Sequence, residues 1–103
     1  MTRRAYLWLV RPGSAAEYKD LHRAIPASLE AEIKERGIRD YSIFYCKETE
    51  QLFAVQERGV EQDPAPPKSD VGEAWAERMR GLLVLDVDGS VVQFELEEVF
   101  RLD

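Results

Sequence analysis

A histidine and two tyrosines are the side chains of this sequence best suited to proton transfer. Tyr18 and His22 are four residues apart, so a helix through this region would place both on one face. An imidazole with an ordinary pKa of about 6.5 can give or take a proton at neutral pH, which makes His22 a candidate acid/base catalyst. Tyr41 could direct its phenol into the same pocket from a neighbouring strand. The alternative is that all three are core residues with satisfied hydrogen bonds.

A second predicted helix carries an aromatic residue together with an unexpected cation. At about 100° per residue, Trp75, Arg78 and Met79 fall on one side of this helix. Trp75 is either a core anchor or a flat surface for the apolar face of a pyranose ring. Arg78 either extends its charged end to solvent or pairs with an acid such as Glu98.

The sequence offers little for metal or cofactor chemistry. One cysteine, Cys46, and one histidine exclude an internal disulfide and any multi-cysteine or multi-histidine metal site within one chain. Asp86 and Asp88 flank a predicted turn, and such an isolated pair is a weak metal signal. No glycine-rich phosphate loop or serine nucleophile motif is present. We therefore expect neither a metal nor an organic cofactor.

Charge and hydropathy exclude further classes of partner. The net charge is −6, from 14 basic and 20 acidic residues, which argues against nucleic acid because its phosphates would be repelled. No apolar run approaches the roughly 18 residues of a membrane span, so we expect no membrane partner. The apolar run at residues 5–10 is too short for a signal peptide. With a lone cysteine as well, the sequence favours a reduced, cytoplasmic protein.

The candidate residues must be positioned by a small set of alternating elements. Apolar alternation predicts strands at residues 5–10, 40–46, 51–57 and 91–102. One helix should begin after a capping box at Ser14 and run toward Arg36, with Pro26 forcing a kink or two pieces and Gly37 ending it. Residues 70–73 predict a second N-terminal cap, with Asp70 as the capping residue, that opens a helix to about Leu83. Residues 58–69 contain three prolines and predict a mobile loop.

The order β-α-β-β-α-β indicates a single α+β domain over residues 1–103 with a ferredoxin-like fold. Its four-stranded antiparallel sheet would carry the helices on one face. The strands are apolar on both faces, however, and helices on one side leave the other face uncovered. We therefore predict a homodimer joined through the sheet faces, a dimeric α+β barrel.

The chain resembles the L-rhamnose mutarotase family of small dimeric α+β-barrel enzymes along nearly its whole length. The resemblance rests on an ordered set of segments: Arg4-Ala5, Pro12, Glu17-Tyr18 with His22, Leu29-Glu30-Ala31, Gly37, Tyr41-Ser42-Ile43-Phe44, Leu52-Phe53-Ala54, Asp70-Val71, Trp75, Met79 and residues 96–102. It implies cofactor-free interconversion of the α and β anomers of a 6-deoxy pyranose. By the same resemblance, His22 matches the catalytic proton donor, Tyr18 and Tyr41 match substrate-binding tyrosines, and Trp75 matches the first of two sugar-contacting tryptophans.

Two departures from the family pattern leave other functions open. Ala76 stands where the second tryptophan is expected, and residues 23–27 replace a segment that usually holds another tryptophan. One alternative is a repurposed barrel acting on a larger non-sugar ligand, as a cyclase, isomerase or cofactor-free oxygenase. Another is a non-catalytic binding dimer, which predicts that His22 is enclosed with no cavity reaching it. An open pocket bounded by His22, Tyr41 and Trp75 would count against this last alternative.

Overall fold

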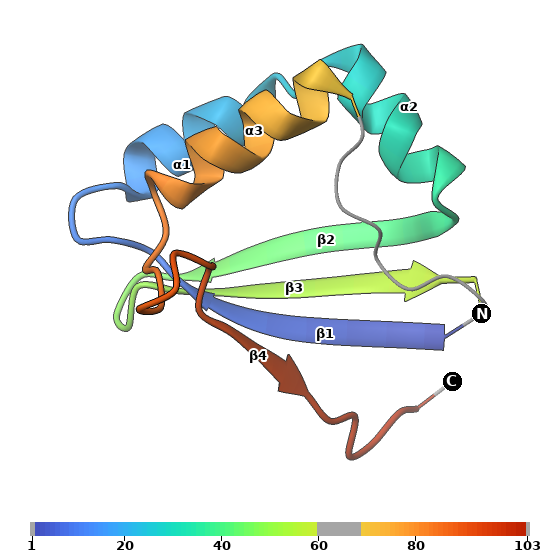
Figure 1. Ribbon diagram of the computed structural model, residues 1–103. Helices are drawn as coiled ribbons and strands as arrows, with labels where there is room; N and C mark the ends of the chain where they lie inside the picture. Colours follow the sequence, from blue (N-terminus) through green and yellow to red (C-terminus); the bar gives the residue numbers. More distant parts are fainter. Residues whose placement is uncertain (1, 60–68, 103) are drawn as a thin grey trace.

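The computed structural model describes residues 2–59 and 69–102 and has the predicted α+β, ferredoxin-like order of elements. Its elements in chain order are β1 (Thr2–Leu9), α1 (Ala15–Arg23), α2 (Ala27–Glu35), β2 (Ile38–Cys46), β3 (Gln51–Arg58), α3 (Asp70–Arg80) and β4 (Gln93–Leu96). These strands form an antiparallel sheet in the order β2-β3-β1-β4. The three helices lie on one face of the sheet (Figure 1).

Pro26 divides the first predicted helix into α1 and α2. Its ψ of 135° is not helical, and the preceding backbone at Ala24 has also left helical geometry. Because proline removes a hydrogen-bond donor and clashes with the turn before it, the helix ends and a new one begins. Gly37 has a φ of +80°, a value that favours glycine, and terminates α2 as predicted. The break sets the direction of α1 independently of α2.

The caps of the helices differ from those predicted. Ser14 occupies the N-cap position of α1, but its side chain makes no capping hydrogen bond, so the expected capping box is wrong. The N-cap of α3 is Ser69, one residue before the predicted Asp70, and its oxygen accepts a hydrogen bond from the Gly72 amide at 2.9 Å. The Ser69 hydroxyl also donates to a carboxylate oxygen of Glu32. Ser69 thereby joins the start of α3 to α2.

The last strand is much shorter than predicted. Only Gln93–Leu96 pairs with β1, whereas the sequence indicated a strand over residues 91–102. The remaining segment leaves the sheet (Figure 1). Its apolar residues Val99, Phe100 and Leu102 are 78–88% exposed, because this segment has no neighbouring strand or face on which to bury them. Helix α3 also ends earlier than predicted, at Arg80. Leu83, which was expected in the helix, instead pairs with Val10, just after the end of β1.

The predicted mobile loop at about 58–69 lies mostly outside the described residues. At its near end, Arg58 belongs to β3 and not to the loop, because its backbone pairs with both Thr2 and Ile38. Within the two described segments, no helix has the length and apolar character needed to cross a membrane.

The two faces of the sheet bury very different amounts of apolar surface. The face toward the helices holds the core, a cluster of Val10, Tyr18, Leu52, Met79, Leu82 and Leu83. On the opposite face, the register places Phe44, Phe53, Leu7 and Phe94 next to one another across all four strands. The outer members of this row, Phe44 and Phe94, are 61% and 53% exposed. We call this row with its neighbours the open face.

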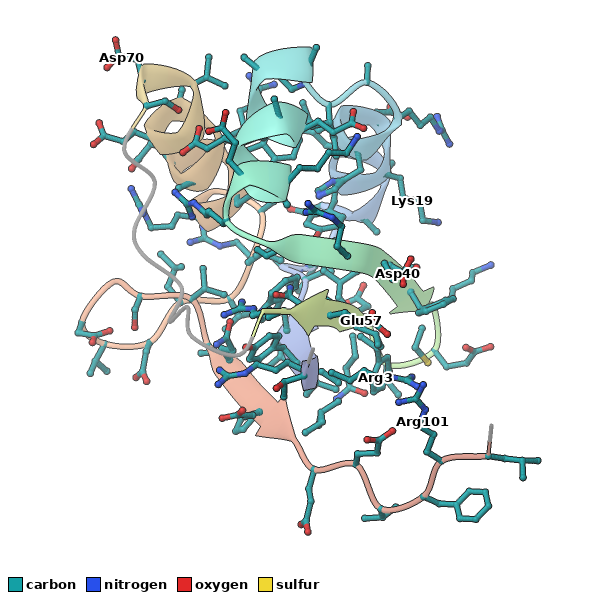
Figure 2. All side chains as sticks on the ribbon, turned by 90° about the vertical axis from the view of Figure 1, so that its right-hand side faces the viewer. Arg3, Lys19, Asp40, Glu57, Asp70 and Arg101 are labelled. Atoms are coloured by element: carbon teal, nitrogen blue, oxygen red, sulfur yellow. The ribbon has the colours of Figure 1, made fainter. Side chains whose placement is uncertain are left out.

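Charged side chains border the open face. In Figure 2, Glu57 and Arg3 lie one above the other on neighbouring strands, with Arg101 of the C-terminal segment below them. Arg3 also approaches Glu98 at 3.9 Å between two largely exposed side chains. The open face is therefore an apolar centre with a polar edge.

Candidate active site

The His22 ring is fixed by the helix that carries it. Its Nδ1 lies 2.7 Å from the backbone carbonyl of Tyr18, one turn earlier in α1. Because a carbonyl oxygen can only accept, Nδ1 carries the hydrogen and donates it. In the neutral imidazole, Nε2 is then left with a free lone pair. The helix thus selects one tautomer and presents a proton acceptor.

Aromatic rings hold the imidazole on two sides. The Tyr18 ring stacks on it with centroids 4.2 Å apart and an interplanar angle of 27°. The Trp75 ring of α3 meets it edge-to-face at 5.1 Å and 73°. These contacts cross between α1 and α3, so the two helices together determine where His22 points.

A cavity opens beside these rings between the helices and the sheet. Its volume is about 480 Å³, and His22, Tyr41 and Trp75 line it together with apolar residues of α2 such as Leu29. An adjoining hollow of about 360 Å³ is lined by the same three residues and by Trp8 and Tyr18. Volumes of this size suit a small organic molecule. The site is therefore open, which is contrary to the enclosed histidine expected of a purely structural dimer.

Burial shifts the proton affinities of the site. Loss of water contact lowers the pKa of His22 below 6.5, and the hydrogen bond to the Tyr18 carbonyl opposes this only in part. Burial, and next the neighbouring Tyr41, raise the pKa of Tyr18 well above its usual range. Burial also raises the pKa of Tyr41 to about 12, with the Arg58 charge acting against it. At neutral pH the site thus contains a neutral imidazole and two protonated phenols.

The four residues singled out from the sequence all border this site. His22, Tyr41 and Trp75 share both cavities, while Tyr18 is 5% exposed and contributes its ring and carbonyl. The Arg78 side chain is 59% exposed and its guanidinium lies 3.6 Å from Glu17 of α1, so it extends to solvent and pairs with an acid, which is Glu17 and not Glu98. Among residues 2–59 and 69–102, no group of three histidine, cysteine or acidic side chains is placed to hold a metal.

Sequence reasoning missed several polar residues of the site. Trp8 donates its indole N–H to the Gln93 side chain at 2.8 Å, and both line the cavity next to His22. Gln56 and Arg58 are only 3% and 8% exposed on the helix side of β3. Continuing the alternation of Leu52 and Ala54 by two more steps would have placed them there.

Comparison with known proteins gives a consistent result. A sequence model of a family described as L-rhamnose mutarotase matches residues 3–102. The chain is 36% identical over 106 residues to an L-rhamnose mutarotase of Bacteroides thetaiotaomicron, and 36% identical over 104 residues to one of Enterobacter sp., covering all of both chains in each case. A crystal structure of an L-rhamnose mutarotase from Formosa agariphila is similar with a TM-score of 0.84 and 28% identity, again over both whole chains.

Proposed function

Because the chain belongs to the L-rhamnose mutarotase family, we propose that it is an isomerase that interconverts the α and β anomers of L-rhamnose. The observation that supports this most directly is the neutral imidazole of His22 at an open cavity of about 480 Å³. Family membership favours a sugar over a larger non-sugar ligand. The open cavity counts against a non-catalytic dimer.

Ring opening requires one proton to leave and another to arrive. We assign His22 Nε2 to accept the proton of the anomeric hydroxyl as the C1–O bond of the ring breaks and the aldehyde forms. Tyr41 donates its phenolic proton to the departing ring oxygen. A phenol with a pKa of about 12 suits this role because it stays protonated at neutral pH and is matched to an alkoxide.

Ring closure reverses these transfers on the other face of the aldehyde. After rotation about C1–C2, the C5 hydroxyl attacks C1 and returns its proton to Tyr41. The imidazolium of His22 then donates its proton to the new anomeric oxygen, so that His22 acts as the proton donor in this half of the reaction. Both groups finish as they began, and no outside proton, electron or co-reactant is consumed.

The remaining site residues orient the sugar. Trp75 offers an indole face to the apolar side of the ring, and we assign Tyr18 to a sugar hydroxyl group, beside Tyr41 at the ring oxygen. Tyr18 has a second role, since its carbonyl holds the His22 tautomer. In this proposal the site residues hold the sugar beside the acid and base groups, and this positioning together with acid/base catalysis accelerates anomer exchange.

The test is anomer exchange measured by saturation-transfer NMR with L-rhamnose. Replacing the imidazole in His22→Ala should reduce the enzymatic acceleration by about 10²-fold or more, which is the usual contribution of acid/base catalysis. Arg23→Ala is the matched control, because Arg23 follows on the same helix but is exposed and pairs with Asp20. Equal exchange rates in wild type and His22→Ala would refute the proposal.

We also propose that two copies of this single domain associate through their open faces. Support comes from the row of Phe44, Phe53, Leu7 and Phe94, which spans the sheet and is partly exposed in one copy. The exposed apolar C-terminal segment lies beside this face and would gain burial on a second copy. The free Cys46 agrees with a cytoplasmic location, where thiols stay reduced.

A further inference from the structure

A guanidinium lies buried among the aromatic residues under the helices. Along β3, the side chains of Leu52, Ala54, Gln56 and Arg58 alternate onto the helix side of the sheet, and all four are buried. Arg58 is 8% exposed. A charged group is rarely enclosed to this extent without a partner, because moving an ion out of water costs on the order of several kcal/mol.

The surroundings of Arg58 satisfy only part of its guanidinium. Its Nε donates to the side-chain oxygen of Gln56, and its Cζ lies 5.7 Å from the centroid of the Tyr6 ring. The ring face attracts the cation weakly. Nη1, however, is buried and has no hydrogen-bond partner among the described residues. One strong donor is therefore left over.

The Arg58 side chain borders a cavity. A hollow of about 290 Å³ is lined by Arg58, Gln56 and Tyr6, and also by Tyr41 and Trp75. The last two residues bound the His22 cavity as well, so the two spaces share a wall. Arg58 and Tyr41 both line this hollow, and the Arg58 charge favours a lower pKa of the Tyr41 phenol, against the larger effect of burial.

Charge around this hollow is of one sign. Arg36 is the other charged residue in the described lining, and it already pairs with Glu32 at 3.0 Å. No carboxylate of the described residues lines the cavity. A buried cation with an unused donor and no lining acid favours an anion over a neutral hydroxyl, because charge-assisted hydrogen bonds are the stronger ones.

The proposed chemistry at His22 indicates where such an anion would sit on a sugar. Tyr41 is assigned to the ring oxygen, and the exocyclic carbon C6 is attached to C5, the atom next to that oxygen. A sugar placed in this way directs its C6 substituent toward the wall that Tyr41 shares with the Arg58 hollow. L-rhamnose carries a methyl group there, which cannot use the free donor, whereas a hexuronate carries a carboxylate.

We propose that Arg58 is a specificity-determining residue that binds the C6 carboxylate of hexuronic acids, which the enzyme accepts as substrates in addition to L-rhamnose. Since no carboxylate of the described residues lines this hollow, the positive charge of Arg58 matches the single negative charge of a carboxylate ligand. The neutral sugar leaves the buried donor unpaired and so loses binding energy that the acid retains. This inference rests on the proposed mutarotase function, because it uses the same ring orientation.

The test compares L-rhamnose with L-mannuronate, which has the same ring and a carboxylate in place of the methyl group. We expect calorimetric titration to show L-mannuronate binding at least about ten-fold tighter to the wild type, the usual scale of one charge-assisted hydrogen bond. Arg58→Met should abolish this preference. Arg3→Met removes the same charge from the opposite face of the sheet and should keep it.

Folding of the variants is checked by thermal melting. Arg58→Met replaces an unpaired buried charge by an apolar side chain of similar length, so its melting temperature should be no lower than that of wild type. Arg58→Lys is the second variant, and it should retain part of the preference because the charge remains. Equal affinities for the two sugars in wild type, or an undiminished preference in Arg58→Met, would overturn the inference.

Two further measurements separate the proposals from each other. Tighter binding of L-mannose 6-phosphate than of L-mannuronate would assign the hollow to phosphate and refute the carboxylate. Accelerated exchange of L-rhamnose without any preference for the acid refutes this inference alone. An Arg58-dependent preference without accelerated exchange of either sugar refutes the mutarotase function and the claim that hexuronic acids are substrates, and leaves only the binding of the carboxylate at Arg58.

Discussion

A single backbone hydrogen bond decides which nitrogen of His22 is free to accept a proton. Since Nδ1 donates to the Tyr18 carbonyl, the reactive lone pair belongs to Nε2, and burial keeps it unprotonated at neutral pH. The pairing of Tyr18 with His22 was predictable from their spacing of one helical turn. The tautomer was not, because it depends on the rotamer and on the surrounding rings.

The proton affinity of His22 gives a pH dependence with a defined sign. Its pKa is lowered from 6.5, so the imidazole stays neutral above pH 6.5 and becomes protonated only below that value. We expect exchange of L-rhamnose to be flat from about pH 6.5 to 8 and to fall about ten-fold per pH unit below the lowered pKa.

This prediction can be followed on the group itself. His22 is the one histidine in the sequence, so its ring protons give a single NMR titration curve. The midpoint should lie below 6.5 and coincide with the acid limb of the rate profile for the free enzyme. A midpoint above 6.5 would contradict the assignment of a neutral resting imidazole.

The burial of Arg58 was not predicted from the sequence. The glycine and prolines that follow Arg58 predict a loop beginning at this residue, although the period-two pattern of β3 continues through it. Its burial depends on helices that are distant in sequence. Strand pairing with Thr2 and Ile38, which cannot be read from β3 alone, extends the strand to this position.

At the level of elements, the three helices position the site from separate directions. The order of elements along the chain followed from hydrophobic alternation and the break at Pro26 from the chemistry of proline, and both were confirmed. The ends of elements were less predictable. Ser69 caps α3 in place of Asp70, and α3 stops at Arg80, because tertiary contacts with α2 and with Val10 decide these ends.

The cap at Ser69 should matter for stability. Ser69→Ala removes the acceptor for the Gly72 amide and the donor to Glu32, and we expect it to lower the free energy of unfolding by about 1 kcal/mol. In a chain of this length the melting temperature should then fall by about 4 °C or more. Calorimetry measures both quantities.

The matched control is Ser69→Thr, which keeps a hydroxyl at the N-cap and should remain within about 0.5 kcal/mol of wild type. Because Trp75 lies on α3, Ser69→Ala should also weaken sugar binding if the cap holds the helix in place. An unchanged melting temperature in Ser69→Ala would show that the hydrogen bond at the cap contributes nothing to stability.

At the scale of the whole molecule, one sheet face is covered by helices and the other is open. The sequence predicted this asymmetry, since β1, β2 and β3 are apolar on both faces while both predicted helices had to lie on the same side. It did not predict that residues 97–102 leave the sheet, because their apolar composition resembles that of a continuing strand. Their exposure becomes visible only when the pairing with β1 ends.

The proposed dimer can be tested by a substitution on the open face. Phe44→Lys places a charge in the row of aromatic residues and should convert the dimer to a monomer, as measured by sedimentation equilibrium. Val87→Lys is the control, because Val87 is fully exposed on the turn before β4 and does not belong to the row. A dimer that persists unchanged in Phe44→Lys would refute association through this face.

In the proposed site, the proton acceptor His22 and the specificity-determining residue Arg58 come from different parts of the chain. His22 belongs to α1, which the break at Pro26 separates from α2, whereas Arg58 belongs to the central strand β3. Ala76 borders the hollows on both sides of this division, and its side chain is a single methyl group. Substitutions in β3 and at position 76 can therefore change which sugars are accepted, while α1 and its histidine are kept unchanged.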